Sequence, residues 1–196
     1  MASDDSDEVD PLRTFTAEEK RQLTEHLCRL TEAAHAGEYS DVAVRPEFIC
    51  SLHRELFTEV RDHAGKMRAR GWGQEYLAFG PNRSCHRNDV KKEIEKLCER
   101  GEIAARSIVS SKLSHDYEYE ALKLALKWHA DFIKIHPFED GNGRTARLML
   151  AIFLVRLGLR PIPVEVPRLE YNEVLNHYYQ NLDLDVLVDL FIGLIN

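Results

Sequence analysis

The sequence has little cysteine, and its four cysteines are scattered. They stand at positions 28, 50, 85 and 98, with no CxxC pair and no Cys/His spacing of the kind that binds zinc. This pattern argues against disulfide cross-links and against a zinc site. We expect reduced and mostly buried thiols.

Long apolar runs and a surplus of positive charge are also missing. No apolar stretch approaches the roughly 20 residues of a membrane span, and 26 basic against 33 acidic residues give a net charge of -7. A general nucleic-acid binder carries a basic contact face. The opening MASDDSDEVDP lacks the basic start and apolar centre of a secretory signal. We therefore predict a cytoplasmic protein that binds neither membrane nor nucleic acid; an effector exported by other machinery would share these features.

The length of 196 residues and the 44% hydrophobic content suit one domain with a sizeable core. We expect an acidic disordered tail over residues 1–12 and a single catalytic domain over residues 13–196.

Helical spacing of apolar residues predicts three helices in the first half of the chain. The first is capped by Thr16 and stops at Gly37, and the second starts near Pro46 and runs to Gly65. The third follows Asp89, with an interruption at Gly101. Between the second and third, residues 69–88 hold three glycines and a proline, which indicates a loop or an irregular hairpin.

The second half contains the strongest helical pattern, which ends where Pro137 disfavours further helix. Its buried stripe consists of Leu122, Leu126, His129, Ile133 and His136. The next helix, in RTARLMLAIFLVRLG, is apolar on nearly all sides and should be the most buried. Two more helices are predicted at Leu169–Tyr179 and Leu184–Ile195. The predicted fold is all-α, a compact bundle with at most one small β-hairpin.

The segment KIHPFEDGNGRTARL, residues 134–148, joins these two central helices. We expect the later helix to begin around Gly143 or Arg144, with Asn142 as its cap. A helix N-terminus offers unpaired amides, and Gly141 and Gly143 leave an anion room to approach them. Together with two arginines three positions apart, Arg144 and Arg147, this predicts a phosphate-binding cradle.

Two further side chains add chemistry to that cradle. Asp140 is a carboxylate of the kind that holds Mg²⁺ together with phosphates and waters. His136 can act as a general base, and the nearby helix C-terminus should raise its pKa. Base, cradle and metal ligand together predict the transfer of a phosphate-containing group to an alcohol.

Three other readings of the segment are weaker. A dinucleotide fingerprint needs a preceding strand, but the preceding residues are helical. A calcium loop starting at Asp140 fails because Arg144 stands at its fifth position. A plain turn between helices would explain the glycines and Pro137 but not the charged set.

The twelve residues HPFEDGNGRTAR, positions 136–147, resemble the signature of the Fic (filamentation induced by cAMP) domain, H-x-F-x-[D/E]-G-N-G-R-x-x-R. All eight defined positions are filled. LHRELFTEVRDHAGKMR, residues 52–68, and EYNEVLNHYYQNLDLDVLVDLFIGLI, residues 170–195, also resemble Fic helices. The resemblance extends from about Phe48 to Ile195.

This resemblance implies a Fic fold and protein AMPylation, in which AMP moves from ATP to a Tyr, Thr or Ser hydroxyl of a target protein. It assigns His136 as the base, Phe138 as an anchor and Asp140 as the Mg²⁺ ligand. The nucleotide would be bound by Gly141, Asn142, Gly143, Arg144 and Arg147. Residues 73–87 would form a flap that aligns the target, or a plain surface loop. Tyr171, Asn176 and Tyr179 are candidates for adenine contacts or for the core, and His129 is expected to be a packed neighbour.

The chain lacks a motif that restrains many Fic proteins, [S/T]-x-x-x-E-[G/N], because none of its glutamates is followed by Gly or Asn. A separate antitoxin-like protein could supply a glutamate to Arg147. Alternatively, the enzyme is unrestrained or another element restrains it. Transfer of UMP, phosphocholine or phosphate remains open, as does a catalytically silent toxin-like or interaction domain, although the intact loop speaks against the silent reading.

Overall fold

The computed structural model describes residues 15–110, 112, 115–162 and 168–195. The acidic tail predicted for residues 1–12 lies outside them. Within the described residues the chain forms seven helices and one hairpin, which confirms the all-α prediction. The elements are α1 (Ala17–His35), α2 (Pro46–Phe57), β1 (Ala78–Phe79), β2 (Asn82–Arg83), α3 (Val90–Ser110), α4 (Tyr117–Ile135), α5 (Asn142–Arg156), α6 (Arg168–Asn181) and α7 (Asp185–Ile195).

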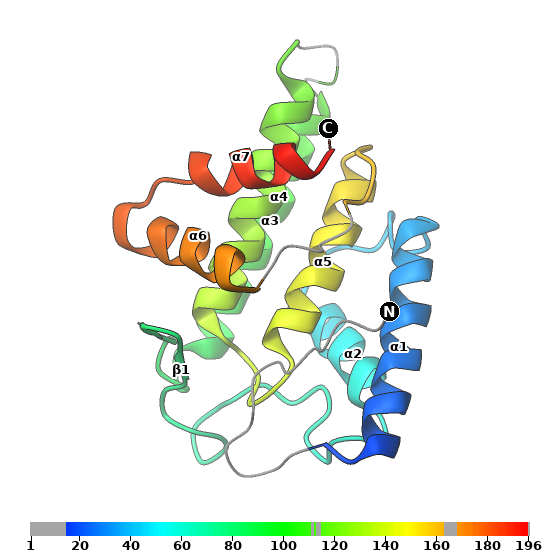
Figure 1. Cartoon of the computed structure of the whole chain (residues 1–196), viewed down its shortest axis with the longest axis vertical. Coiled ribbons are helices and arrows are strands. Elements are labelled where there is room, and N and C mark those ends of the chain that lie inside the picture. The colour runs from blue at the N-terminus through cyan, green and yellow to red at the C-terminus, as the bar shows by residue number, and fades with distance from the viewer. Residues whose placement is uncertain (1–14, 111, 113–114, 163–167, 196) are drawn as a thin grey trace.

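Two long helices, α4 and α5, form the middle of the bundle (Figure 1). The helix α3 packs on α4, α1 and α2 pack on α5, and α7 crosses α4. The turn from α4 to α5 and the hairpin lie at the same end of the molecule (Figure 1). The loop that contains the predicted phosphate-binding cradle is thus held between two packed helices.

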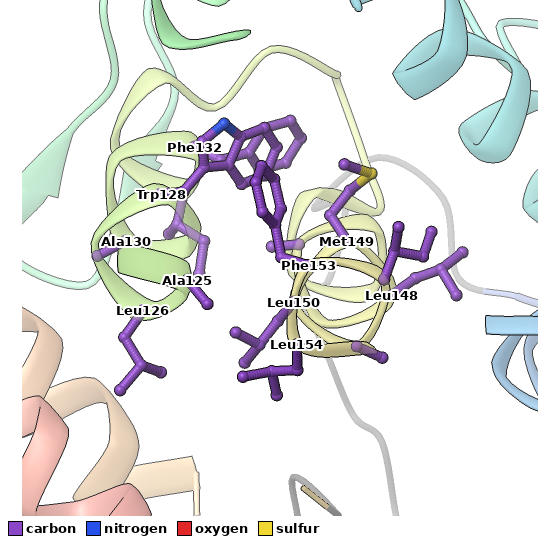
Figure 2. Close-up of a cluster of buried hydrophobic side chains, with 14 of the residues drawn as sticks. Ala125, Leu126, Trp128, Ala130, Phe132, Leu148, Met149, Leu150, Phe153 and Leu154 are labelled. Carbon is purple, nitrogen blue, oxygen red and sulfur yellow. The ribbon is translucent and has the colours of Figure 1, made fainter. Parts of the chain in front are cut away.

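Large side chains fill the contact between α4 and α5 (Figure 2). The Trp128 ring stacks on Phe132 at 5.4 Å between centroids and lies 4.9 Å from Phe153. Buried residues cover nearly every side of α5, as predicted. No helix within the described ranges is long and apolar enough to cross a membrane.

The start of α1 is built as its sequence predicts. The Thr16 side chain accepts a hydrogen bond from the Glu19 amide at 3.1 Å, and the Glu19 carboxylate accepts one from the Thr16 amide at 2.8 Å. This reciprocal capping box satisfies two amides that a helix start would leave unpaired.

The second helix is shorter than predicted. It ends at Phe57, because Thr58 takes an extended conformation (ψ 137°) and Glu59 has a positive φ of 64°. The apolar spacing continues through Val60 and Ala64, and Val60 is buried from a turn. Periodicity alone could not distinguish these turn residues from another helical turn.

The predicted break in the third helix at Gly101 is wrong, because α3 runs through it. A Cβ at position 101 would lie 2.7 Å from Cδ1 of Trp128. The glycine therefore admits the Trp128 ring and does not end the helix.

The prediction of mostly buried cysteines is also wrong. All four thiols are free, but only Cys98 is buried, while Cys28 is exposed and the other two are half-buried. Burial raises the pKa of Cys98 to about 12.

Candidate active site

The helix α4 ends at Ile135, and its C-cap residue His136 has a left-handed conformation. Its φ and ψ are 54° and 63°, and its amide still donates to the Phe132 carbonyl at 3.0 Å. A residue with a side chain pays a strain cost in this region, and such strain is concentrated at functional sites. The helix thus ends with the His136 ring turned out of the helical path just before Pro137.

His136 is 4% exposed, and its ring has a defined tautomer. Its Nδ1 lies 3.1 Å from the Ile133 carbonyl, so Nδ1 carries the proton and Nε2 keeps the lone pair. Burial lowers the pKa of His136 to about 4, although the bond to Ile133 opposes this shift. The predicted rise in this pKa is therefore wrong, because desolvation outweighs the helix C-terminus.

The loop from His136 to α5 is closed by Asn142. Its side-chain oxygen accepts from the Phe138 amide at 2.9 Å, and its amide nitrogen donates to the Phe138 carbonyl at 2.8 Å. The predicted N-cap role of Asn142 is wrong: it is the first residue of α5, and Gly141 is the cap. The buried side chain of Asn142 holds the loop in shape.

Gly141 is required by packing as well as by its backbone. It has a φ of 76°, and a Cβ at this position would lie 2.1 Å from the Phe57 ring. Next to it, His53 accepts a hydrogen bond from the Gly65 amide at 2.8 Å and donates to the Asp140 carbonyl at 3.0 Å. Since the His53 ring also stacks on Phe138 at 3.8 Å, α2 supports the loop from behind.

The start of α5 has the features of an anion site. The first hydrogen bond of the helix joins the Thr145 amide to the Gly141 carbonyl at 3.0 Å, so the three amides of residues 142–144 have no partner within the helix. Arg144 lies in this first turn and is 5% exposed. Arg147 lies one turn later, and its Nη1 is 3.6 Å from the position that a Cβ on Gly143 would take. Both arginines predicted to bind phosphate thus lie in the first two turns of α5, beside the predicted phosphate-binding cradle.

Asp140 is buried between two arginines. Its Oδ1 accepts from the Gly141 amide at 2.6 Å and lies 3.9 Å from Nη1 of Arg144. Its Oδ2 lies 3.4 Å from Nε of Arg61 but has no hydrogen-bond partner among the described residues.

No cluster of three or more His, Cys, Asp or Glu side chains suited to a metal occurs in the described part of the chain. Mg²⁺ on a nucleotide needs only one or two protein carboxylates, because phosphates and waters complete its shell. Oδ2 of Asp140, which no described residue hydrogen-bonds, fits that role.

The candidates for adenine contacts are engaged in packing. The Tyr171 hydroxyl bonds to Nε2 of the buried His129, and the Tyr179 hydroxyl donates to the Ala130 carbonyl at 2.9 Å. The Asn176 side chain pairs with Asn82 of the hairpin. The structural role expected for His129 is confirmed, since its Nδ1 also lies 2.9 Å from the Ala146 carbonyl.

The hairpin reaches the histidine. The Phe79 ring stacks on the His136 ring with centroids 4.8 Å apart and an interplanar angle of 7°. The irregular hairpin predicted for residues 69–88 is confirmed, with Ala78 opposite Arg83 and Phe79 opposite Asn82.

Arg68 and Glu139 join this hairpin segment to the loop, and residue patterns gave neither a role. The Arg68 guanidinium donates to the His136 carbonyl at 2.7 and 2.9 Å, to the Gln74 carbonyl at 3.1 Å and to the Cys85 carbonyl at 3.2 Å. Glu139 accepts from the Gln74 amide. The A-G-x-x-R ending pointed at Arg68 only as part of a resemblance, and Glu139 fills a position that the signature leaves free.

Comparison with known proteins supports this geometry. The sequence model of the Fic/DOC family matches residues 43–154, more than half of the 196. The chain belongs to the Fic/DOC family. The match contains the whole Fic signature at 136–147, so the family resemblance read from those residues is confirmed.

Individual relatives share shorter segments with this Fic chain. It is 41% identical over 66 residues to the protein adenylyltransferase Fic of Nematostella vectensis. The matched segment covers 33% of this chain and 14% of that protein. The chain is 39% identical over 75 residues to a ribonucleoside-diphosphate reductase small chain of Ostreid herpesvirus 1 (isolate France), covering 38% and 12%. The chain therefore spans a small fraction of these relatives.

Among solved structures, the BepC protein of Bartonella tribocorum, a VirB-translocated effector with bound AMPPNP, has a TM-score of 0.67. That likeness covers 90% of this chain and 86% of the other at 14% identity. At this identity it supports the Fic fold.

Proposed function

We propose that this Fic chain transfers AMP from ATP to a Tyr, Thr or Ser hydroxyl of a target protein and releases pyrophosphate. The observation that carries the proposal is the His136 tautomer. The ring is neutral and keeps its lone pair on Nε2, in the same loop as two arginines and a helix start whose first three amides have no partner within the helix. A proton acceptor and an anion site in one loop suit phosphoryl-group transfer to an alcohol.

In the proposed reaction, Nε2 of His136 takes the proton of the target hydroxyl. The hydroxyl oxygen forms a bond to the α-phosphorus of ATP, and the bond from that phosphorus to the β-phosphate oxygen breaks. The amides of residues 142–144 and the Arg144 and Arg147 guanidinium groups hold the phosphates. Mg²⁺, held by Asp140, would supply charge neutralisation at the leaving phosphates.

Binding of the phosphates should also change the pKa of the base, His136. A nearby negative charge favours the protonated imidazole, so it should raise the pKa of His136 from its low value in the nucleotide-free chain. The histidine would then become a better proton acceptor when ATP is present.

Incubation with a cell lysate and ATP labelled at either the α- or the γ-phosphate tests this function. Label from the α position alone supports AMP transfer, whereas γ label indicates a kinase. Labelled UTP and CDP-choline test UMP and phosphocholine transfer, and no label from any donor would favour a silent interaction domain.

The matched variant is His136→Asn. Asn tolerates the left-handed backbone of this position better than Ala does, so the variant removes the base with little added strain. We expect transfer to fall by roughly 10²- to 10⁴-fold. Replacement of the exposed His115 by Asn should leave transfer unchanged, and equal activity of the two variants would contradict the role of His136.

We propose that the chain works in the cytoplasm.

We also propose that a separate antitoxin-like protein restrains the enzyme by placing a glutamate on Arg147. The absence of a Glu-Gly or Glu-Asn pair from this sequence motivates this proposal of a separate inhibitor. Affinity purification from the native cells should recover a small partner that is lost with Arg147→Ala. Full transfer activity in cells with no bound partner would contradict it.

A further inference from the structure

A second buried arginine, Arg61, adjoins the active-site loop from the turn after α2. Its side chain is 3% exposed. It lies between two carboxylates, with Nε 3.4 Å from Oδ2 of Asp140 and Nη1 3.9 Å from Oε1 of Glu19 in α1. Neither the family signature nor the sequence patterns gave Arg61 a role.

Most N–H donors of Arg61 have no hydrogen-bond partner within the described ranges. Its Nη1 donates weakly to the Val60 carbonyl at 3.5 Å, but Nε and Nη2 are buried and have no hydrogen-bond partner among the described residues. Oδ2 of Asp140, which faces Nε, likewise has no hydrogen-bond partner in the described part of the chain. Buried polar groups normally have hydrogen-bond partners, and a buried group left without a hydrogen bond costs stability. Because both members of this ion pair lack hydrogen bonds, a bound ligand could supply them, and the pair is a candidate ligand contact.

Arg61 is also the neighbour of the predicted phosphate ligand Arg144. The Phe15 ring centroid lies 3.8 Å from Cζ of Arg61 and 5.5 Å from Cζ of Arg144. The two guanidinium groups thus share one aromatic ring and flank the two oxygens of Asp140. Of the two, only Arg61 is paired with a second carboxylate, that of Glu19, in the described part of the chain.

We propose that Arg61 is the resident counter-ion of Asp140 in the nucleotide-free chain, and that it exchanges this carboxylate for a phosphate when a nucleotide binds, with or without Mg²⁺. The proposal rests on the proposed function only in assigning Mg²⁺ to Asp140. A guanidinium and a divalent cation compete for the same Oδ2. The planar guanidinium, whose Nε and Nη2 have no hydrogen-bond partner among the described residues, suits a phosphate oxygen well.

Two opposite effects of Arg61 follow. It competes with Mg²⁺ at Asp140, and it contributes a phosphate contact that needs no metal. Arg61 therefore weakens the dependence of nucleotide binding on Mg²⁺. Its removal should strengthen that dependence.

Isothermal titration with α,β-methylene-ATP, which cannot release AMP, measures this coupling. The quantity of interest is the ratio of Kd in EDTA to Kd in Mg²⁺. We expect Arg61→Gln to raise the ratio by about tenfold or more, because a hydrogen bond to a charged group is lost in EDTA while the competitor is removed in Mg²⁺. Arg29→Gln, an exposed arginine paired with Glu55, is the matched control and should leave the ratio unchanged.

The same titration contains the results that would overturn the proposal. A purely structural role would raise both Kd values together and leave the ratio unchanged. If Arg61 only orders Asp140 as a metal ligand, the ratio would fall. Should Arg61→Gln fold poorly, the double variant Glu19→Gln/Arg61→Gln removes the two opposite charges together and is judged by the same ratio.

Asp140→Asn separates this inference from the function on which it rests. The variant should bring the ratio close to one if Asp140 holds the metal. A ratio that keeps its full Mg²⁺ dependence would overturn both the metal assignment and the exchange. Since the titration involves neither a target nor AMP transfer, failure of the labelling experiment leaves the result for Arg61 intact.

Discussion

At the scale of single residues, His136 combines three constraints that its position in the chain creates. Pro137 ends the helix behind it, the left-handed backbone turns its ring, and the Ile133 carbonyl selects the tautomer. Arg68 takes up the carbonyl of the same residue at 2.7 Å. The Ile133 carbonyl therefore holds the ring of the base, and the Arg68 guanidinium holds its backbone carbonyl.

The low pKa of His136 predicts an unusual pH profile. Burial lowers this pKa to about 4, so the ring stays neutral as the pH falls from 7 to about 5.5. We expect kcat/KM for AMP transfer to stay nearly flat over this range, since kcat/KM reports the free enzyme. A histidine with the ordinary pKa near 6.5 would lose about nine-tenths of its neutral form by pH 5.5. A midpoint near 6.5, with circular dichroism showing folded protein, would contradict the burial argument.

The residues of the site were predictable where chemistry and backbone demands coincide in the sequence. His136, Asp140, Arg144 and the glycines lie within twelve positions, and the structure keeps them in one loop. The roles of Arg61 and Arg68 were not predictable, because each is separated from its loop partner by more than 60 residues. A single sequence contains no signal that pairs them.

At the scale of elements, the same glycine signal has two meanings. Gly37 follows the end of α1 with a φ of 81°, as predicted, whereas Gly101 lies inside α3. Only the packed partner of Gly101, the Trp128 ring, distinguishes the two cases. The end of α2 is a similar case, since apolar spacing persisted beyond the point where the backbone left the helix.

Two glycine-to-alanine changes test this reading of α3. Gly101→Ala gains up to about 1 kcal/mol of helix propensity. It also places a Cβ 2.7 Å from the Trp128 ring. Overpacking costs about 1–3 kcal/mol, so we expect a net loss in the free energy of unfolding.

Gly193→Ala in α7 is the matched control, because a Cβ there meets nothing within 4 Å. It should stabilise the protein by up to about 1 kcal/mol. Urea denaturation measures both variants. A gain for Gly101→Ala equal to that for Gly193→Ala would mean that Trp128 does not restrict position 101.

At the scale of the whole molecule, three neutral histidines lie within the bundle. Burial lowers the pKa values of His53, His129 and His136 to about 4 each. In the unfolded chain each should titrate near 6.5. Between these two values the unfolded state binds more protons than the folded state, so the free energy of unfolding falls as the pH falls below 6.5.

The size of this acid sensitivity can be assigned to one histidine. At pH 5 each buried histidine should have cost about 2 kcal/mol of stability relative to pH 7. His53→Gln keeps an acceptor for the Gly65 amide and a donor for the Asp140 carbonyl but cannot titrate. We therefore expect the loss of stability from pH 7 to pH 5, measured in urea, to be about 2 kcal/mol smaller in this variant than in the parent chain. His115→Gln, at an exposed position, should show the parent's full loss. An undiminished loss in His53→Gln would mean that this ring is protonated in the folded state at pH 5, and that the bundle does not exclude charge from beneath the active-site loop.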